Sequence, residues 1–161
     1  MKYTFTISAT IGTTLTAALV FVALDAGSQD AEATITFLNQ PFAKADLQFG
    51  KELYDDNCAS CHGAELEGQP DWQRRLENGR MPAPPHDETG HTWHHSDRVL
   101  FEITKGGVGA IVPGYESDMP AFVEVLTDEE IRAVLAFIKS TWPERQSAFQ
   151  EEITANDEGG S

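Results

Sequence analysis

The chain contains two cysteines, and both lie in one pentapeptide, Cys58-Ala59-Ser60-Cys61-His62. Two cysteines three positions apart cannot build a disulfide scaffold. They can form a redox-active dithiol, half of a zinc site or the two attachment points of a haem. The residue that follows the second cysteine separates these three uses, and here it is a histidine.

A haem tether needs two thiols that reach the two vinyl groups of one macrocycle, and an imidazole placed to ligate the iron. A helical turn with the spacing CxxCH meets that requirement, and this is the attachment signature of haem c. A redox dithiol should follow an apolar strand, whereas residues 50–57 are mostly polar. A structural zinc site usually has a second CxxC, which this chain lacks. The motif therefore favours one covalent haem c on Cys58 and Cys61, with His62 as one axial ligand.

The second axial position needs another side chain, and methionine sulfur opposite histidine gives a six-coordinate iron suited to electron transfer. Apart from Met1, the chain offers Met81 and Met119. Met119 is followed by Pro120, which stiffens the backbone beside it, and the pair lies just before the last predicted helix of the domain. We therefore predict Met119 as the ligand and Met81 as a packing residue, with a core position for Met119 as the alternative.

The N-terminus has the pattern of an export segment. Residues 3–24 are uncharged, and as a helix they would span about 33 Å, roughly one bilayer core. Lys2 precedes this stretch and Asp25 follows it, which predicts that the N-terminus stays inside while the rest is exported. We expect residues 1–26 to be a signal peptide or a retained membrane anchor, followed by a polar linker at 27–43.

The exported part has the periodicity of helices separated by long irregular loops. Helices are predicted at 43–57, at 71–78, from the capping residue Ser96 to a stop at Gly106, and after the capping box of Thr127 with Glu130. The last of these carries an apolar stripe made by Ile131, Val134, Leu135 and Ile138, and it ends at Trp142-Pro143. No strand alternation is visible. We expect an all-α domain at 44–143 and an acidic, mobile tail at 144–161.

Several of these features, taken in order, resemble the class I cytochrome c family over about residues 44–143: Gly50 and Tyr54 in the first helix, CxxCH followed by Gly63, the Met119-Pro120 loop and the capped last helix. The resemblance implies a fold of three to five helices around one haem c, with the first and last helices crossed. It also implies His62 and Met119 as axial ligands. Gly50 and Tyr54 would then meet the face of the last helix that carries Leu135 and Ile138.

A loop at 81–95 contains three prolines and four of the five histidines, which are His86, His91, His94 and His95. These imidazoles could bind a second metal or compete with Met119 for iron, or they could bond to haem propionates and loop carbonyls. We expect the last role, with Trp93 beside the propionates and Tyr54 in the haem environment. The carbonyl of Pro84 or Pro85 would orient His62 through its second ring nitrogen.

The formal charge of −15 argues against nucleic acid or an anionic membrane surface as the main partner. A protein partner should instead present a basic or apolar patch. These features predict a one-electron carrier without catalytic residues, in a bacterial respiratory or related chain. It would lie in the periplasm or on the periplasmic side of the inner membrane. The alternatives are the cytochrome subunit of a membrane dehydrogenase or oxidase, and a five-coordinate haem protein that binds gases.

Overall fold

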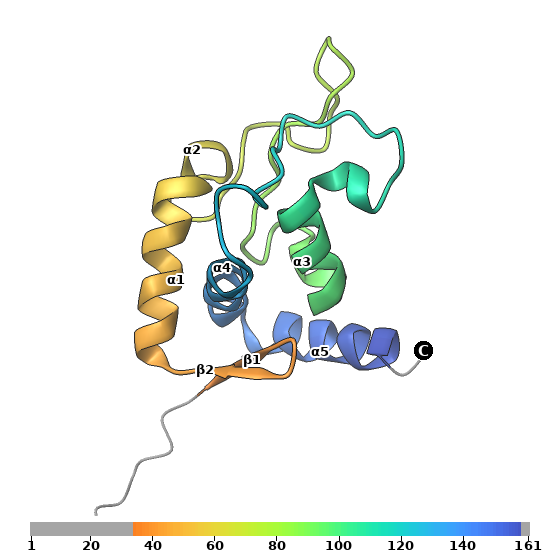
Figure 1. The fold of residues 1–161 in the computed structure, drawn as a ribbon. Coiled ribbons are helices and arrows are strands. Elements are labelled where there is room, and N and C mark those ends of the chain that lie inside the picture. The colour runs from red at the N-terminus through yellow and green to blue at the C-terminus, as the bar shows by residue number, and fades with distance from the viewer. Residues whose placement is uncertain (1–33, 159–161) are drawn as a thin grey trace, which may run out of the picture. The chain divides into compact units, whose positions relative to one another are not determined.

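The computed structural model describes residues 34–158 (Figure 1). The predicted signal or anchor at 1–26 and the first part of the predicted linker lie outside these residues. Within them, no helix has both the length and the apolar character needed to cross a bilayer. The described part contains five α-helices and one two-stranded sheet, which confirms the mainly helical class and corrects the expectation that strands are lacking.

The described chain opens with a β-hairpin where a polar linker was predicted. Strands β1 (Ile35–Phe37) and β2 (Gln40–Phe42) pair antiparallel through a two-residue turn. Both turn residues have positive φ, 48° at Leu38 and 61° at Asn39, the backbone that such tight hairpins require. Phe37 and Phe42 are buried in the main core. The linker prediction is therefore wrong for residues 35–42, because the hairpin contributes two aromatic side chains to the core.

Helices α1 (Lys44–Asn57) and α4 (Asp128–Ser140) cross in direct contact (Figure 1). A Cβ atom built on Gly50 would lie 2.1 Å from the carbonyl oxygen of Ala133, so only glycine permits this approach. The Tyr54 ring packs 5.7 Å from the Phe137 ring, measured between centroids. The predicted crossing of the first and last helices of the domain is thus confirmed. The contacts recorded for Gly50 and Tyr54 are with Ala133 and Phe137, while Leu135 and Ile138 are buried in the core.

The predicted caps are present in the structure. The Thr127 hydroxyl accepts a hydrogen bond from the Glu130 backbone, and the Glu130 carboxylate accepts one from the Thr127 backbone, which completes the capping box of α4. Ser96 caps α3 (Asp97–Gly106) by accepting from the Val99 amide. The bonds accepted by the Thr127 and Ser96 hydroxyls satisfy amide groups that the first helical turn leaves without partners.

The helix predicted at 71–78 does not form. Residues 71–80 are a series of turns, because Asp71 has a φ of 54° and Gly79 one of 83°, values outside the helical region. This part of the chain projects from the helical domain and then runs back to it, and we call residues 69–83 the arm. Three short helical elements complete the loops: α2 (Ala59–His62), and the 3-10 turns η1 (Thr92–His94) and η2 (Val108–Ala110).

The predicted mobile tail is also wrong, because residues 144–158 form helix α5 (Glu144–Glu158). Its Gln150 is completely buried, and the side-chain amide donates to Asp97 Oδ1 at 2.7 Å. Near its end, Asp157 accepts hydrogen bonds from Ser96 and from Arg98. Polar contacts rather than an apolar stripe therefore hold α5 against the start of α3.

Candidate functional site

The two cysteines lie on one turn at the end of α1. The Cys58 amide still donates to Tyr54 O at 2.8 Å, and the His62 amide donates to Cys58 O at 2.9 Å. Gly63, with a φ of 83°, then reverses the chain. Cys58 is half-buried and Cys61 is exposed, and neither forms a disulfide. Both sulfurs are therefore available on one helical turn, as a haem attachment requires.

The electrostatics of the pair argue against a redox dithiol. Burial, with a smaller contribution from the nearby Cys61, raises the pKa of the Cys58 thiol to about 11. Reactive dithiols need the opposite, a thiol whose pKa is lowered so that the thiolate forms near neutral pH. Cys58 is thus a poor nucleophile for disulfide exchange, and a thioether to a bound group suits its environment better.

His62 is held in the form that binds a metal. Its side chain is buried, and Nδ1 lies 2.8 Å from the carbonyl oxygen of Pro84. A carbonyl only accepts, so Nδ1 carries the proton and Nε2 keeps its lone pair. Burial lowers the pKa of His62, and the bond to Pro84 opposes this shift. Of the two carbonyls considered from the sequence, that of Pro84 makes the contact.

One histidine of the 81–95 loop stacks directly on His62. The His86 ring lies 4.0 Å from the His62 ring, centroid to centroid, at an angle of 21°. Its Nδ1 is 2.8 Å from the hydroxyl of Thr92, which in turn donates to Pro85 O. Burial, together with the neighbouring His62 and His91, lowers the pKa of His86 well below its usual value. Two neutral imidazoles therefore lie face to face, a contact that the sequence did not predict.

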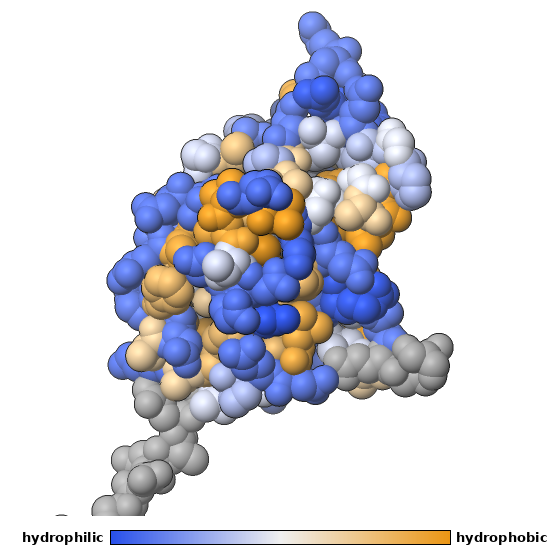
Figure 2. Space-filling model, viewed as in Figure 1, coloured by the Kyte–Doolittle hydropathy of each residue, from blue (hydrophilic) through white to orange (hydrophobic). Residues whose placement is uncertain are grey.

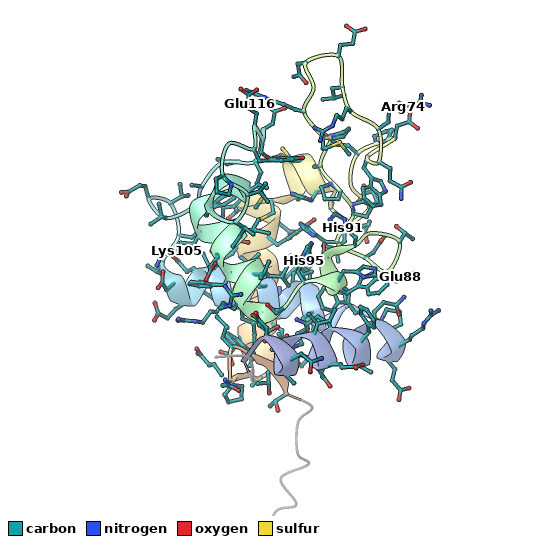
Figure 3. The ribbon with its side chains drawn as sticks, turned by 90° about the vertical axis from the view of Figure 1, so that its right-hand side faces the viewer. Arg74, Glu88, His91, His95, Lys105 and Glu116 are labelled. Carbon is teal, nitrogen blue, oxygen red and sulfur yellow. The ribbon has the colours of Figure 1, made fainter. Side chains whose placement is uncertain are left out.

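The other three loop histidines use their rings in aromatic contacts. His91 stacks on Trp72 at 5.4 Å, His94 stacks on Trp93 at 3.8 Å, and His95 meets the edge of His91. Figure 3 shows His91 and His95 together in the loop above α5. Among the described residues, no group of three or more histidine, cysteine or acidic side chains is arranged to hold a metal ion.

Two further predicted residues have distinct places. Tyr54 is completely buried and its hydroxyl donates to Gly63 O at 2.8 Å, so it fixes the turn that follows His62. Burial raises the pKa of Tyr54, which keeps this hydroxyl protonated. The indole Nε1 of Trp93 is buried and has no hydrogen-bond partner in the described structure. A buried donor of this kind costs about 1–3 kcal/mol, so a bound group with acceptor oxygens would satisfy it.

Met119 lies in the segment between η2 and α4, partly buried against the main core. Three residues further on, the loop is attached to α3, where the Phe122 amide donates to Thr104 O at 3.2 Å. Met81, also partly buried, belongs to the arm instead. The available donors thus comprise two thiols, an imidazole with a free Nε2, a thioether and an unpaired indole N–H. This set fits one haem c.

Comparison with known proteins agrees with this chemistry. A family model described as cytochrome c matches residues 47–142. The cytochrome c-555 of Prosthecochloris aestuarii is 35% identical over 68 residues, which cover 38% of this chain and 69% of that protein. The gluconate 2-dehydrogenase cytochrome c subunit of Pantoea cypripedii is 28% identical over 138 residues, or 81% of this chain and 29% of that protein.

A third relative, the cbb3-type cytochrome c oxidase subunit CcoP of Azospirillum brasilense, is 28% identical over 112 residues. That match covers 68% of this chain and 33% of the subunit. The chain therefore spans about a third of the length of these gluconate dehydrogenase and oxidase subunits. No solved structure matches it.

Proposed function

We propose that this chain, which belongs to the cytochrome c family and carries one covalent haem c, transfers single electrons through an iron ligated by His62 and Met119. Thioether bonds from Cys58 and Cys61 would hold the haem. The observation that carries this proposal is the bond from His62 Nδ1 to Pro84 O, which leaves Nε2 as a ligand aimed by the fold. In class I cytochromes a methionine opposite histidine gives a saturated iron that exchanges electrons without binding substrate.

The haem iron supplies the change of oxidation state, and the protein supplies position and environment. Tyr54 and Pro84 keep the turn and the His62 ring fixed, so little rearrangement accompanies the change of charge. Trp93 Nε1 would donate to a haem carboxylate. The exposed Cys61 lies near the surface, so a haem edge bonded to it would be within reach of a docked partner.

A docking partner would use both charge and apolar contact. Figure 2 shows apolar surface over the segment between α3 and α4, with hydrophilic surface around it. Val123 and Val125 of this segment are 48% and 62% exposed. We propose that a redox protein with an apolar patch and a basic rim binds this face, and that rising salt weakens the association.

Two of the relatives are subunits of a dehydrogenase and an oxidase, and this supports a second candidate. In it, the chain is the cytochrome subunit of such a complex, on the periplasmic side of a bacterial inner membrane. Chromatography of the exported protein from solubilised membranes distinguishes the two. Co-elution with a larger oxidoreductase supports the subunit, and recovery as a free monomer from the soluble fraction, before any detergent is added, supports the carrier.

The ligand set can be tested by spectroscopy on matured protein in both redox states. We expect a c-type pyridine haemochrome and, in the oxidised state, a weak near-infrared band from methionine ligation. Met119→Ala should lose this band and bind carbon monoxide readily when reduced, whereas Met81→Ala should keep the band. If Met119→Ala keeps the wild-type spectrum, the proposed axial ligand is wrong. If wild-type reduced protein binds carbon monoxide avidly at neutral pH, a five-coordinate gas-binding haem replaces the electron carrier.

A further inference from the structure

The 69–83 arm extends from the domain beside the segment that carries Met119. Figure 1 shows it reaching past the loop between α3 and α4, and Figure 3 shows Arg74 and Glu116 at that same end of the molecule. Three of the eleven basic residues of this acidic chain lie in the arm, namely Arg74, Arg75 and Arg80. Neither the haem ligands nor the predicted docking surface accounts for this concentration of cations.

Hydrogen bonds within the arm give it a defined shape. At its base, the Gln69 amide donates to Ala83 O, and the Ala83 amide donates to the Gln69 side chain, both at 2.9 Å. Near its tip, the Leu76 amide donates to Arg80 O at 2.8 Å. The Arg75 guanidinium donates to Gly79 O at 2.7 Å. The arginines of the arm therefore project from a backbone that is held by hydrogen bonds.

Two of these arginines contact the Met119 segment. The Arg80 guanidinium forms a hydrogen-bonded ion pair with Asp118, the residue immediately before Met119. The Arg75 guanidinium lies over the Tyr115 ring, 6.0 Å from its centroid, at the outer limit of a cation–π contact. Arg74 has neither kind of contact in the described structure. The arm thus holds the segment at two points, three residues apart.

The Met119 segment has few other polar attachments. Between residues 116 and 121, the described structure gives two hydrogen-bonded contacts. One is internal, from the Met119 amide to the Ser117 hydroxyl at 3.1 Å. The other is the pair of Asp118 with Arg80. The attachments to α3 begin only at Phe122 and Val123. The Arg80–Asp118 pair is therefore the polar tie between the ligand stretch and the rest of the domain.

We propose that Arg80 is a positioning residue that holds Met119 against the haem iron through Asp118, with Arg75 as a second support. This inference rests on the proposed function, in which Met119 is the axial ligand. Dissociation of methionine from the iron requires its segment to move outward, and that movement breaks the tie to the arm. Each contact with the arm should thus raise the free energy that is needed to dissociate Met119 from the iron.

The expected effect is modest because the pair is exposed. The side chains of Arg80 and Asp118 are 38% and 55% exposed, and such ion pairs contribute up to about 1 kcal/mol, or about fivefold in an equilibrium constant. Salt screens exposed charges, so the effect should shrink between 10 mM and 500 mM salt. Reversing one charge replaces attraction with repulsion between the arm and the segment.

The test titrates oxidised holoprotein with imidazole, which competes with Met119 for the iron. Arg80→Asp and Asp118→Arg should each bind imidazole about three- to fivefold more tightly than wild type. The double reversal restores an ion pair and should return to within about twofold of wild type. Arg74→Asp makes the same change of charge in the same arm without a contact to break, so it should also stay within about twofold.

Hydrogen exchange of the holoprotein gives a readout that does not depend on imidazole. Amides at 115–121 should exchange faster in Arg80→Asp than in wild type or Arg74→Asp. If the two arginine variants behave alike, or the double reversal fails to restore the wild-type affinity, the tie is refuted while Met119 remains the ligand. If wild type lacks the methionine band and Met119→Ala leaves imidazole affinity unchanged, the proposed ligand itself fails, and the tie fails with it.

Discussion

A buried ion pair lies where four parts of the domain meet, and its disruption is the strongest test of how the fold is held together. Lys139 of α4 lies 3.3 Å from Asp97 Oδ1, and the two side chains are 7% and 3% exposed. The same carboxylate accepts hydrogen bonds from the Leu38 backbone amide at 2.9 Å and from the Gln150 side-chain amide at 2.7 Å. Asp97 thereby connects the hairpin, α4 and α5 to the start of α3.

Replacing Lys139 with methionine keeps the volume of the side chain and removes its charge. The Asp97 carboxylate then stays buried with two neutral donors and no cation. Removing one partner of a buried pair typically costs about 3–5 kcal/mol, because the remaining charge is not compensated. For a domain of this size, about 4 °C of melting temperature corresponds to 1 kcal/mol, so Lys139→Met should melt about 12–20 °C lower.

An exposed pair of the same chemistry provides the matched control. Lys105 lies 2.7 Å from Asp128, but these side chains are 37% and 40% exposed, so Lys105→Met should cost no more than about 1 kcal/mol. Urea denaturation of holoprotein, followed by far-ultraviolet circular dichroism, measures both. Adding Asp97→Asn to Lys139→Met should recover part of the loss, since no buried charge remains. Equal costs for the two lysine variants would refute the reasoning.

Three further outcomes are expected. Gly50→Ala should destabilise the domain by more than about 2 kcal/mol in urea denaturation, although alanine favours helices, because its Cβ would lie 2.1 Å from Ala133 O. Bonds from Thr127 lower the pKa of Glu130, so its contribution is present above the ordinary glutamate value and is lost as pH falls through the lowered one. The stability difference between wild type and Glu130→Gln should therefore shrink on acidification. Deleting α5 should lower the melting temperature of the holoprotein, because the deletion exposes the residues that pack around the fully buried Gln150. An unchanged melting temperature would mean that α5 does not contribute to the stability of the domain.

The elements that could be predicted are those whose signals are local. Ser96 and Thr127 lie within three residues of the amides that they cap, and Glu130 lies within the same turn as Thr127. The CxxCH motif is likewise local, because its five residues include both thiols and the imidazole. The carbonyl that orients His62 was predicted only as that of Pro84 or Pro85, and the structure shows that it is Pro84.

The missed elements depend on partners that are distant in the sequence. The strands at 35–37 and 40–42 have three residues each, too few to show alternation. Helix α5 has no apolar stripe, and its attachments join residues 53 to 61 positions apart. The stacking of His86 on His62 spans 24 positions and leaves no pattern in the chain. Such contacts become visible only when the fold brings their residues together.

The later elements also hold the backbone of the histidine-rich loop. Trp142 Nε1 donates to His86 O at 2.8 Å, and Gln150 Nε2 donates to His95 O at 3.3 Å. These donors come from the turn after α4 and from α5, and they fix the backbone on both sides of Trp93. With the backbone held from outside, the imidazole rings are free to stack on aromatic neighbours and on His62. The C-terminal helix therefore acts on the site through the loop carbonyls, and its removal should loosen the surroundings of Trp93 while the turn at 58–62, held by α1, keeps its shape.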